Sequence, residues 1–263
     1  MEEPETLSTL PRSVLLALWV QHVGVGSAPL QRAVRAVEGD DEPHTVANDD
    51  DPGISGDSLP DLLAAWASGP HDVAALLPTP GDVAGVPAVI SAAAIDAGEC
   101  VLVRTGQGAF AAVPTIEEFG TAWEPGHLVT WTVHRIPDWR TTLLGTVGSL
   151  ADAERELRTA LTSATQAPAS LDVARWRPDA ADAIAALQAD GDGWQVPPEL
   201  DGRRLRVLVS AARLRAIVEL ATADDGGAIN LWQADQRSTA LREVDRAARR
   251  AMSAATVRVD GSA

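Results

Sequence analysis

The chain has 263 residues and is 46% hydrophobic, as is typical of a globular protein with a buried core, and this composition excludes an intrinsically disordered chain. Its 37 acidic residues outnumber its 21 basic residues and give a net charge of −16. Because a strongly acidic surface repels phosphate groups, we expect neither general nucleic-acid binding nor attachment to anionic membranes.

A single cysteine and an acidic start indicate the compartment. Cys100 is the only cysteine, so the chain forms no intramolecular disulfide and no cysteine-based zinc site. Residues 1–5 are acidic where a secretion signal would be basic. The longest apolar run, residues 14–20, is far shorter than the roughly 20 residues that cross a membrane. We therefore predict a cytoplasmic protein that does not enter the membrane.

The first part of the chain is predicted to be mainly helical. Apolar residues recur at helical spacing in three segments, 11–23, 30–37 and 59–67. An Ala-rich stretch at 87–97, followed by a glycine, indicates another helix. Residues 38–57 are rich in Asp, Gly and Pro and contain few apolar side chains, so we expect an acidic mobile loop there.

A small antiparallel sheet is predicted at about 99–147. Segments 99–104 and 109–114 flank a Thr-Gly-Gln-Gly connection, which indicates a hairpin. Residues 128–136 alternate apolar with polar side chains, as a half-buried strand does. A weaker pattern at 143–147 leaves a further strand open. We expect a meander of three or four strands.

The rest of the chain has a helical pattern. Helices are expected over 149–166, 178–189, 201–223 and 231–255. The predicted fold class is therefore α+β and helix-dominated, with N-terminal helices, a small antiparallel β meander and a C-terminal helical bundle. A boundary near residue 148 would separate an α+β part, 1–148, from a bundle, 149–263. One continuous domain stays open as an alternative, because the small sheet needs a helical layer on one face.

Motifs for common cofactors and catalytic groups each fail at a position that their chemistry requires. The segment Gly24–Pro29 has proline where a dinucleotide-binding loop needs its third glycine, and it follows a helix rather than a strand. The acidic run 48–53 is not followed by the glutamate that a calcium loop needs. The histidines show no metal-ligand spacing, and Glu99 beside Cys100 would raise the pKa of a thiol that a catalytic role needs lowered. We expect no cofactor and no metal.

The strongest candidate ligand site is the end of the predicted strand 128–136. It contains His134, Arg135, Trp139 and Arg140, which together could bind an anionic or aromatic ligand. The alternative is a polar strand exit with Trp139 folded onto the body of the protein.

A second cluster is a candidate protein interface. Arg175, Trp176 and Arg177 belong to the residue types that dominate binding hot spots, although Trp176 could equally anchor the start of a helix. The arginines of the last helix alternate with acidic residues, which indicates a solvated face rather than a nucleic-acid site.

Several segments together resemble a known family. They are Leu77–Asp82 with Ala94–Glu99, then Ala174–Pro178, and then Ala223–Ala228 followed by Asp245–Arg250. Their order and composition resemble an uncharacterised conserved protein family of high-GC actinobacteria, over about residues 70–253. The resemblance implies a source of that kind and carries no activity and no catalytic residues.

Two functions are left open by the sequence. Because no catalytic constellation has its required spacing, we favour a non-catalytic protein-interaction or regulatory protein, with a protein partner or self-association. The alternative is a small-molecule-binding enzyme or sensor that uses the His134–Arg140 region. Whether the protein is an enzyme is undecided at this point.

Overall fold

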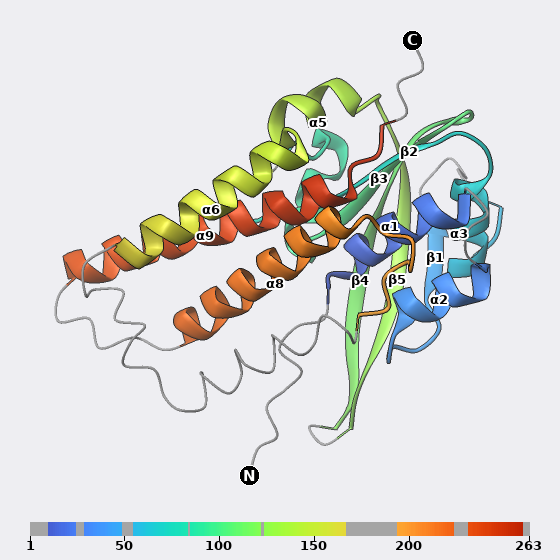
Figure 1. The fold of residues 1–263 in the computed structure, drawn as a ribbon. Coiled ribbons are helices and arrows are strands. Elements are labelled where there is room, and N and C mark those ends of the chain that lie inside the picture. The colour runs from blue at the N-terminus through green and yellow to red at the C-terminus, as the bar shows by residue number, and fades with distance from the viewer. Residues whose placement is uncertain are drawn as a thin grey trace. The chain divides into compact units, whose positions relative to one another are not determined.

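The computed structural model divides the chain into two compact units (Figure 1). It describes residues 10–24, 29–48, 55–83, 85–121, 124–166, 194–223 and 231–259. The N-terminal unit consists of Pro11–Gly148, Gln195–Asp201 and Thr256–Ala263. The C-terminal unit consists of Met1–Leu10, Ser149–Trp194 and Gly202–Ala255. Segments that are distant in the sequence therefore complete the N-terminal unit.

Within the described residues, the N-terminal unit is built on a five-stranded sheet with the order β1-β5-β4-β3-β2. The strands are β1 (Thr45–Asn48), β2 (Asp72–Leu76), β3 (Cys100–Thr105), β4 (Gly108–Thr121) and β5 (Glu124–Ile136). Strands β2 to β5 pair antiparallel in sequence order, whereas β1 pairs parallel with β5. The expected sheet at 99–147 is corrected accordingly: the sheet is mixed, and two of its strands lie before residue 99.

Strand β1 falls inside the expected acidic loop 38–57, so that prediction is wrong for these four residues. Val46 is the only buried residue of β1, and the strand is held by backbone pairing with β5 from Thr130 to Val133. A strand with so little apolar content gives no hydrophobic pattern, which explains why composition indicated a loop. Residues 49–54 of the expected loop lie outside the described residues.

The possible strand at 143–147 is also wrong, because Arg140–Val147 form helix α5. Leu143 and Val147 are both buried and lie four residues apart, on one face of the helix, whereas Leu144 is 53% exposed. Leu143, Gly145 and Val147 also alternate as they would in a strand, so a short segment of this kind fits both periods.

The helices predicted in the N-terminal part of the chain are confirmed. They are α1 (Arg12–Gly24), α2 (Leu30–Glu38), α3 (Leu59–Ala67), and η1 (Ala88–Ile90) continuing into α4 (Ser91–Ala97). Helix α1 contacts β2 and β3, and also α2 and α3. Every side chain from Leu16 to Val20 is buried. Helix α1 is therefore the central core element of this unit.

An acidic side chain just before strand β3 caps helix α1. The Oε2 atom of Glu99 accepts a hydrogen bond from the backbone N–H of Ser13 at 2.7 Å, in the first turn of the helix. Helix N-termini carry N–H groups without intrahelical partners and a partial positive charge, so a carboxylate there is stabilising. Glu99 thus has a structural role beside the buried Cys100.

The end of the last helix and the residues that follow it cover the outer edge of the sheet. Val73 of β2 and Arg258 exchange both backbone hydrogen bonds, each at 2.9 Å. Thr256 accepts two more: its Oγ1 from the N–H of Ala75 at 2.9 Å, and its carbonyl oxygen from Nε2 of Gln21 at 2.7 Å. The outer edge of β2 is therefore covered by a segment that is almost 200 residues away in the sequence, at 256–258.

The described part of the C-terminal unit is helical. Its helices are α6 (Leu150–Gln166), α8 (Gly202–Ala223) and α9 (Leu231–Thr256), as predicted for 149–166, 201–223 and 231–255. The predicted helix at 178–189 lies outside the described residues. Ion pairs join each of these helices to the other two: Arg203–Glu154 at 2.8 Å, Arg215–Asp245 at 3.7 Å and Arg250–Glu156 at 3.9 Å. Over the part of the chain that the structure describes, no helix has the length and hydropathy that a membrane span requires.

Candidate functional site

The first two residues of the predicted ligand site lie next to each other in β5. Successive side chains of a strand point to opposite faces, so His134 and Arg135 do not share a face. The guanidinium carbon of Arg135 lies 5.0 Å from the ring centroid of Phe110, which is a cation–π distance. Its Nη1 atom donates to the carbonyl oxygen of Gln107 at 3.3 Å. Arg135 is therefore held against the adjacent strand.

Arg140 belongs to a cluster of ion pairs at the end of the sheet. Its Nη2 atom lies 2.8 Å from Oδ2 of Asp138, and its Nη1 atom lies 3.4 Å from Oδ2 of Asp72. Arg104 lies 3.4 Å from Asp138 and 3.8 Å from Asp72. The hydrogen bond from Arg140 lowers the pKa of Asp138. Two guanidiniums and two carboxylates thus compensate one another in this cluster.

Trp139 is separated from these groups by burial. It is 2% exposed, and its indole N–H has no hydrogen-bond partner among the described residues. The structure consequently places Arg135 in a cation–π contact, Arg140 in an ion-pair cluster and Trp139 in the core, while His134 is half-buried on the other face of β5. It does not bring them together around one cavity. The predicted interface residues Arg175, Trp176 and Arg177 lie outside the described residues.

A second polar cluster, which the sequence does not predict, surrounds Asp41. This carboxylate is only 7% exposed, and it accepts hydrogen bonds from Nη2 of Arg12 at 2.7 Å and from Nε2 of His44 at 3.0 Å. Nδ1 of His127 lies 3.2 Å from Oδ1 of Asp41. The groups come from helix α1, the turn after α2 and strand β5. No spacing along the sequence could have joined them.

His44 resembles a catalytic histidine oriented by a carboxylate, but its second nitrogen is occupied. The indole N–H of Trp131 donates to Nδ1 of His44 at 3.1 Å. An indole nitrogen can only donate, so Nδ1 must accept, and the proton of the neutral ring is on Nε2, facing Asp41. The side chain of His44 has no exposed surface. The arrangement therefore fixes the fold and leaves no nitrogen for proton transfer to a substrate.

The electrostatics of this cluster favour a neutral histidine and an ionised aspartate. Burial lowers the pKa of His44 and outweighs the opposing effect of Asp41. Burial alone would raise the pKa of Asp41, yet the hydrogen bonds from Arg12 and His44 together lower it. The hydrogen bond to Asp41 in turn raises the pKa of Arg12.

Stability should therefore fall as the solution becomes acidic. Below a pH of about 6.5, the ordinary histidine value, the unfolded chain binds a proton that folded His44 does not. The contribution of neutral His44 to the free energy of unfolding is complete above that pH. It is lost as the pH decreases toward the lowered pKa of His44. Urea unfolding of the wild type between pH 7 and 5 should show this loss. In the H44Q variant the free energy of unfolding should depend less steeply on pH. The same dependence as in the wild type would contradict a neutral His44 in the folded protein.

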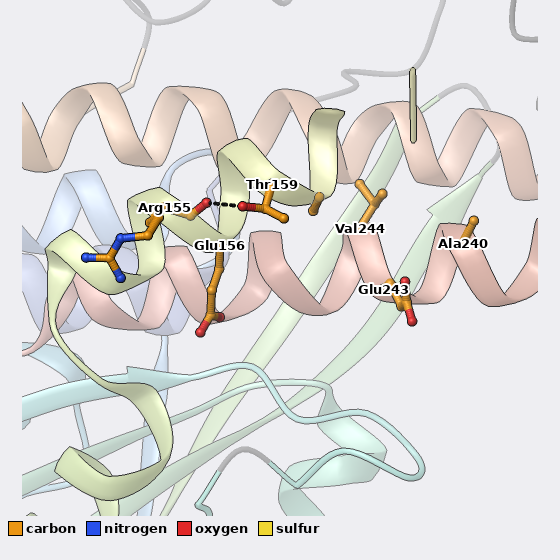
Figure 2. Close-up of a pocket in the computed structure, with 7 residues that line it drawn as sticks. Arg155, Glu156, Thr159, Ala240, Glu243 and Val244 are labelled. Carbon is orange, nitrogen blue, oxygen red and sulfur yellow. Dashed lines mark hydrogen bonds between the residues drawn. The ribbon is translucent and has the colours of Figure 1, made fainter. Parts of the chain in front are cut away.

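The C-terminal unit contains a groove between α6 and α9 (Figure 2). Its volume is about 320 Å³, and it is lined by Arg155, Glu156, Thr159 and Ala160 of α6 and by Ala240, Glu243 and Val244 of α9. The hydroxyl of Thr159 donates to the carbonyl oxygen of Arg155 at 3.0 Å within the same helix. Alanine and valine side chains therefore leave the groove largely apolar.

Acidic side chains flank this apolar groove. Glu156 lies 3.9 Å from Arg250, which is a long ion pair, and Arg155 is bound to Asp152 at 2.8 Å. Glu243 makes no hydrogen bond or ion pair with any described residue. The arrangement can accept an apolar side chain in the groove and a positive charge beside Glu243.

One wall of this groove lies in a helix that the sequence predicts. Val244 lies in the segment 231–255, which is predicted to be a helix. The other wall comes from α6, and which helix lies beside α9 cannot be read from helical periodicity alone. Among the described residues, no group of three His, Cys, Asp or Glu side chains is placed to hold a metal ion.

Comparison with known proteins identifies the family. A model described as "Rv1486c-like protein, N-terminal domain" matches residues 13–146, and one described as "Rv1486c-like protein, C-terminal domain" matches residues 151–253. No curated protein and no solved structure matches the chain. The two matched ranges contain almost all of the described residues of both units. The chain therefore belongs to the Rv1486c-like protein family.

Proposed function

We propose that this is a non-catalytic, cytoplasmic protein that binds another protein through the groove between α6 and α9. The observation that carries the proposal is the apolar floor of Ala160, Ala240 and Val244 beside the uncompensated carboxylate of Glu243. Leu161, the residue after Ala160, is 46% exposed and adds apolar surface to α6. Exposed apolar surface next to polar groups is typical of protein-binding sites.

The shape of the groove favours a helix as the bound element. We infer that α6, α8 and α9 pack as a helical bundle, which gives the groove two parallel walls of helical side chains. A partner helix can place residues spaced three and four apart into such a groove. The volume of about 320 Å³ is at the lower end of the range for small-molecule sites, so it suits single apolar side chains.

The charge of the groove favours a basic partner. Glu243 and Glu156 both flank it, and the whole chain has a net charge of −16. A partner helix with arginine or lysine beside its apolar residues would be attracted over a distance and would pair with Glu243 on docking. An acidic helix of the same shape would be repelled. We therefore propose an amphipathic basic helix as the occupant.

Charge reversal at Glu243 tests the proposal. The probe is a fluorescein-labelled peptide helix with leucines spaced three and four apart and arginines on either side, titrated with the full-length protein. We expect E243R to weaken binding about tenfold, as loss of roughly 1.4 kcal/mol would. We expect A240R, which also fills the groove, to weaken it further.

Two controls make the result specific. E199R changes the net charge equally at an exposed residue of the N-terminal unit, and it should leave the affinity within about twofold. A peptide with glutamate in place of each arginine should not bind. Equal losses in E243R and E199R, or equal binding of the two peptides, would refute the groove as the site.

A small-molecule site at His134–Arg140 has less support. Arg140 is paired with Asp138 and Asp72, and Arg135 lies over Phe110, so a ligand anion would have to displace existing partners. Breaking such pairs costs part of the binding free energy. We therefore prefer the protein-binding function to the small-molecule site.

A further inference from the structure

The β4–β5 hairpin is longer than the strands beside it (Figure 1). Strand β3 pairs with β4 only from Gly108 to Ala112, whereas β5 pairs with β4 as far as Thr121. Over residues 115–120, no described strand lies on the outer side of β4. The backbone groups on that side form an edge that another strand could extend.

Apolar side chains on this part of the hairpin are exposed. All residues from 115 to 120 are exposed, including Ile116 at 36% and Phe119 at 45%. A side chain at Gly126 would place its Cβ 2.5 Å from the ring of Phe119, so the ring lies directly over this glycine of β5. The ring is thus held in position while almost half of it faces solvent. A fixed, half-exposed aromatic ring loses little entropy on binding.

The same edge is acidic. Glu117 and Glu118 lie at its centre, Glu124 begins β5, and the sequence from residue 113 to 130 contains no arginine or lysine. Charged side chains in an edge strand disfavour pairing with a like-charged strand. They leave pairing with a basic strand possible.

We propose that the outer edge of β4 at 115–120 binds an extended segment of another protein, in which arginine or lysine alternates with apolar residues. The segment adds a strand to the hairpin: its backbone pairs with β4, its basic side chains lie on the face of Glu118, and its apolar side chains lie on the opposite face and contact Phe119. Affinity comes from the backbone pairing and the apolar contacts, and selectivity comes from the charges.

A second copy of this chain is a poorer occupant. If two β4 edges paired antiparallel over residues 115–120, Glu117 of each copy would lie directly opposite Glu118 of the other. Like charges directly opposite each other in paired strands are destabilising. The edge is therefore assigned to a different, basic protein. This surface belongs to the N-terminal unit and is independent of the groove proposed above.

Hydrogen exchange of the full-length protein tests this inference. The probe is a soluble peptide in which valine and arginine alternate, added in excess, with exchange read by mass spectrometry. We expect slower exchange in the peptides that contain residues 115–120 and no change in α6 or α9. The same peptide with every backbone nitrogen methylated has no N–H donor on either edge and cannot form the ladder, so it should give no protection. Equal protection by both peptides would overturn strand addition.

Charge variants identify the edge that is used. E118R should weaken the alternating peptide about tenfold, whereas E124R, which has the same charge change on β5, should leave its affinity within about threefold. Equal effects of both variants would refute the assignment to the β4 edge. Sedimentation of the protein alone as a dimer, with residues 115–120 already protected, would assign the edge to a second copy instead.

Discussion

Replacing Asp41 with alanine is expected to lower the free energy of unfolding of the N-terminal unit by about 3–5 kcal/mol, because it breaks a buried ion pair from one side. The variant leaves the Nε2–H of His44 without an acceptor in a site with no exposed surface. It also removes the carboxylate that neutralises Arg12. A buried donor without a partner retains the full cost of its dehydration. The effect should therefore exceed that of an exposed ion pair.

Urea unfolding, monitored by hydrogen exchange of the amides in β1 and β5, measures this effect in the N-terminal unit. Exchange is needed because two units can unfold separately, and one spectroscopic signal would then mix them. D40A is the matched control, since Asp40 is the exposed neighbour of Asp41, and it should change stability by less than about 0.5 kcal/mol. Equal stability of D41A and D40A would show that the cluster does not hold α1, the turn after α2 and β5 together.

Removing residues 256–263 is expected to destabilise the same unit by about 3–5 kcal/mol, although the cut lies more than 100 residues beyond the sheet in the sequence. The deletion removes the paired backbone bonds between Val73 and Arg258 and both bonds made by Thr256. It also removes the bond from Nη1 of Arg258 to the carbonyl oxygen of Gln21 at 3.2 Å. At about 1 kcal/mol each, these five hydrogen bonds account for the expected loss.

Deleting only residues 260–263 is the control, because all five bonds come from residues 256–258. The shorter deletion should leave the midpoint of urea unfolding unchanged. Exchange of the backbone amides of Val73 and Ala75 gives a local readout, and both should exchange faster only in the longer deletion. If β2 exchanges at the wild-type rate after the longer deletion, the C-terminal segment does not stabilise the sheet edge.

The sequence predicted elements well where one face of the element is apolar over two or more turns. Helices α3 and α8 are examples, and their observed bounds, Leu59–Ala67 and Gly202–Ala223, agree with the predicted segments to within one residue. Short elements were predicted poorly. Strand β1 has one buried residue, and α5 has a pattern that fits helix and strand alike. In both, packing against the rest of the chain decides the conformation.

The candidate sites depend on contacts that a single sequence does not contain. His44 and Trp131 are 87 residues apart, and their hydrogen bond exists only because β1 pairs with β5. The groove likewise requires α6 beside α9. By contrast, the cluster at His134–Arg140 was conspicuous in the sequence, yet Asp72 and Phe110, which engage its arginines, come from other strands. Nearness in sequence suggested a shared site that the strand geometry does not form.

The central claim, that the groove between α6 and α9 binds an amphipathic basic helix, is tested most directly by photo-crosslinking. The Leu/Arg peptide, with one leucine replaced by photo-leucine, is irradiated with the full-length protein, and the attached residues are found by mass spectrometry. We predict attachment within residues 155–160 and 240–244, and its loss in A240R. Attachment concentrated at 115–120 or elsewhere in the N-terminal unit, or attachment that persists unchanged in A240R, would contradict the claim.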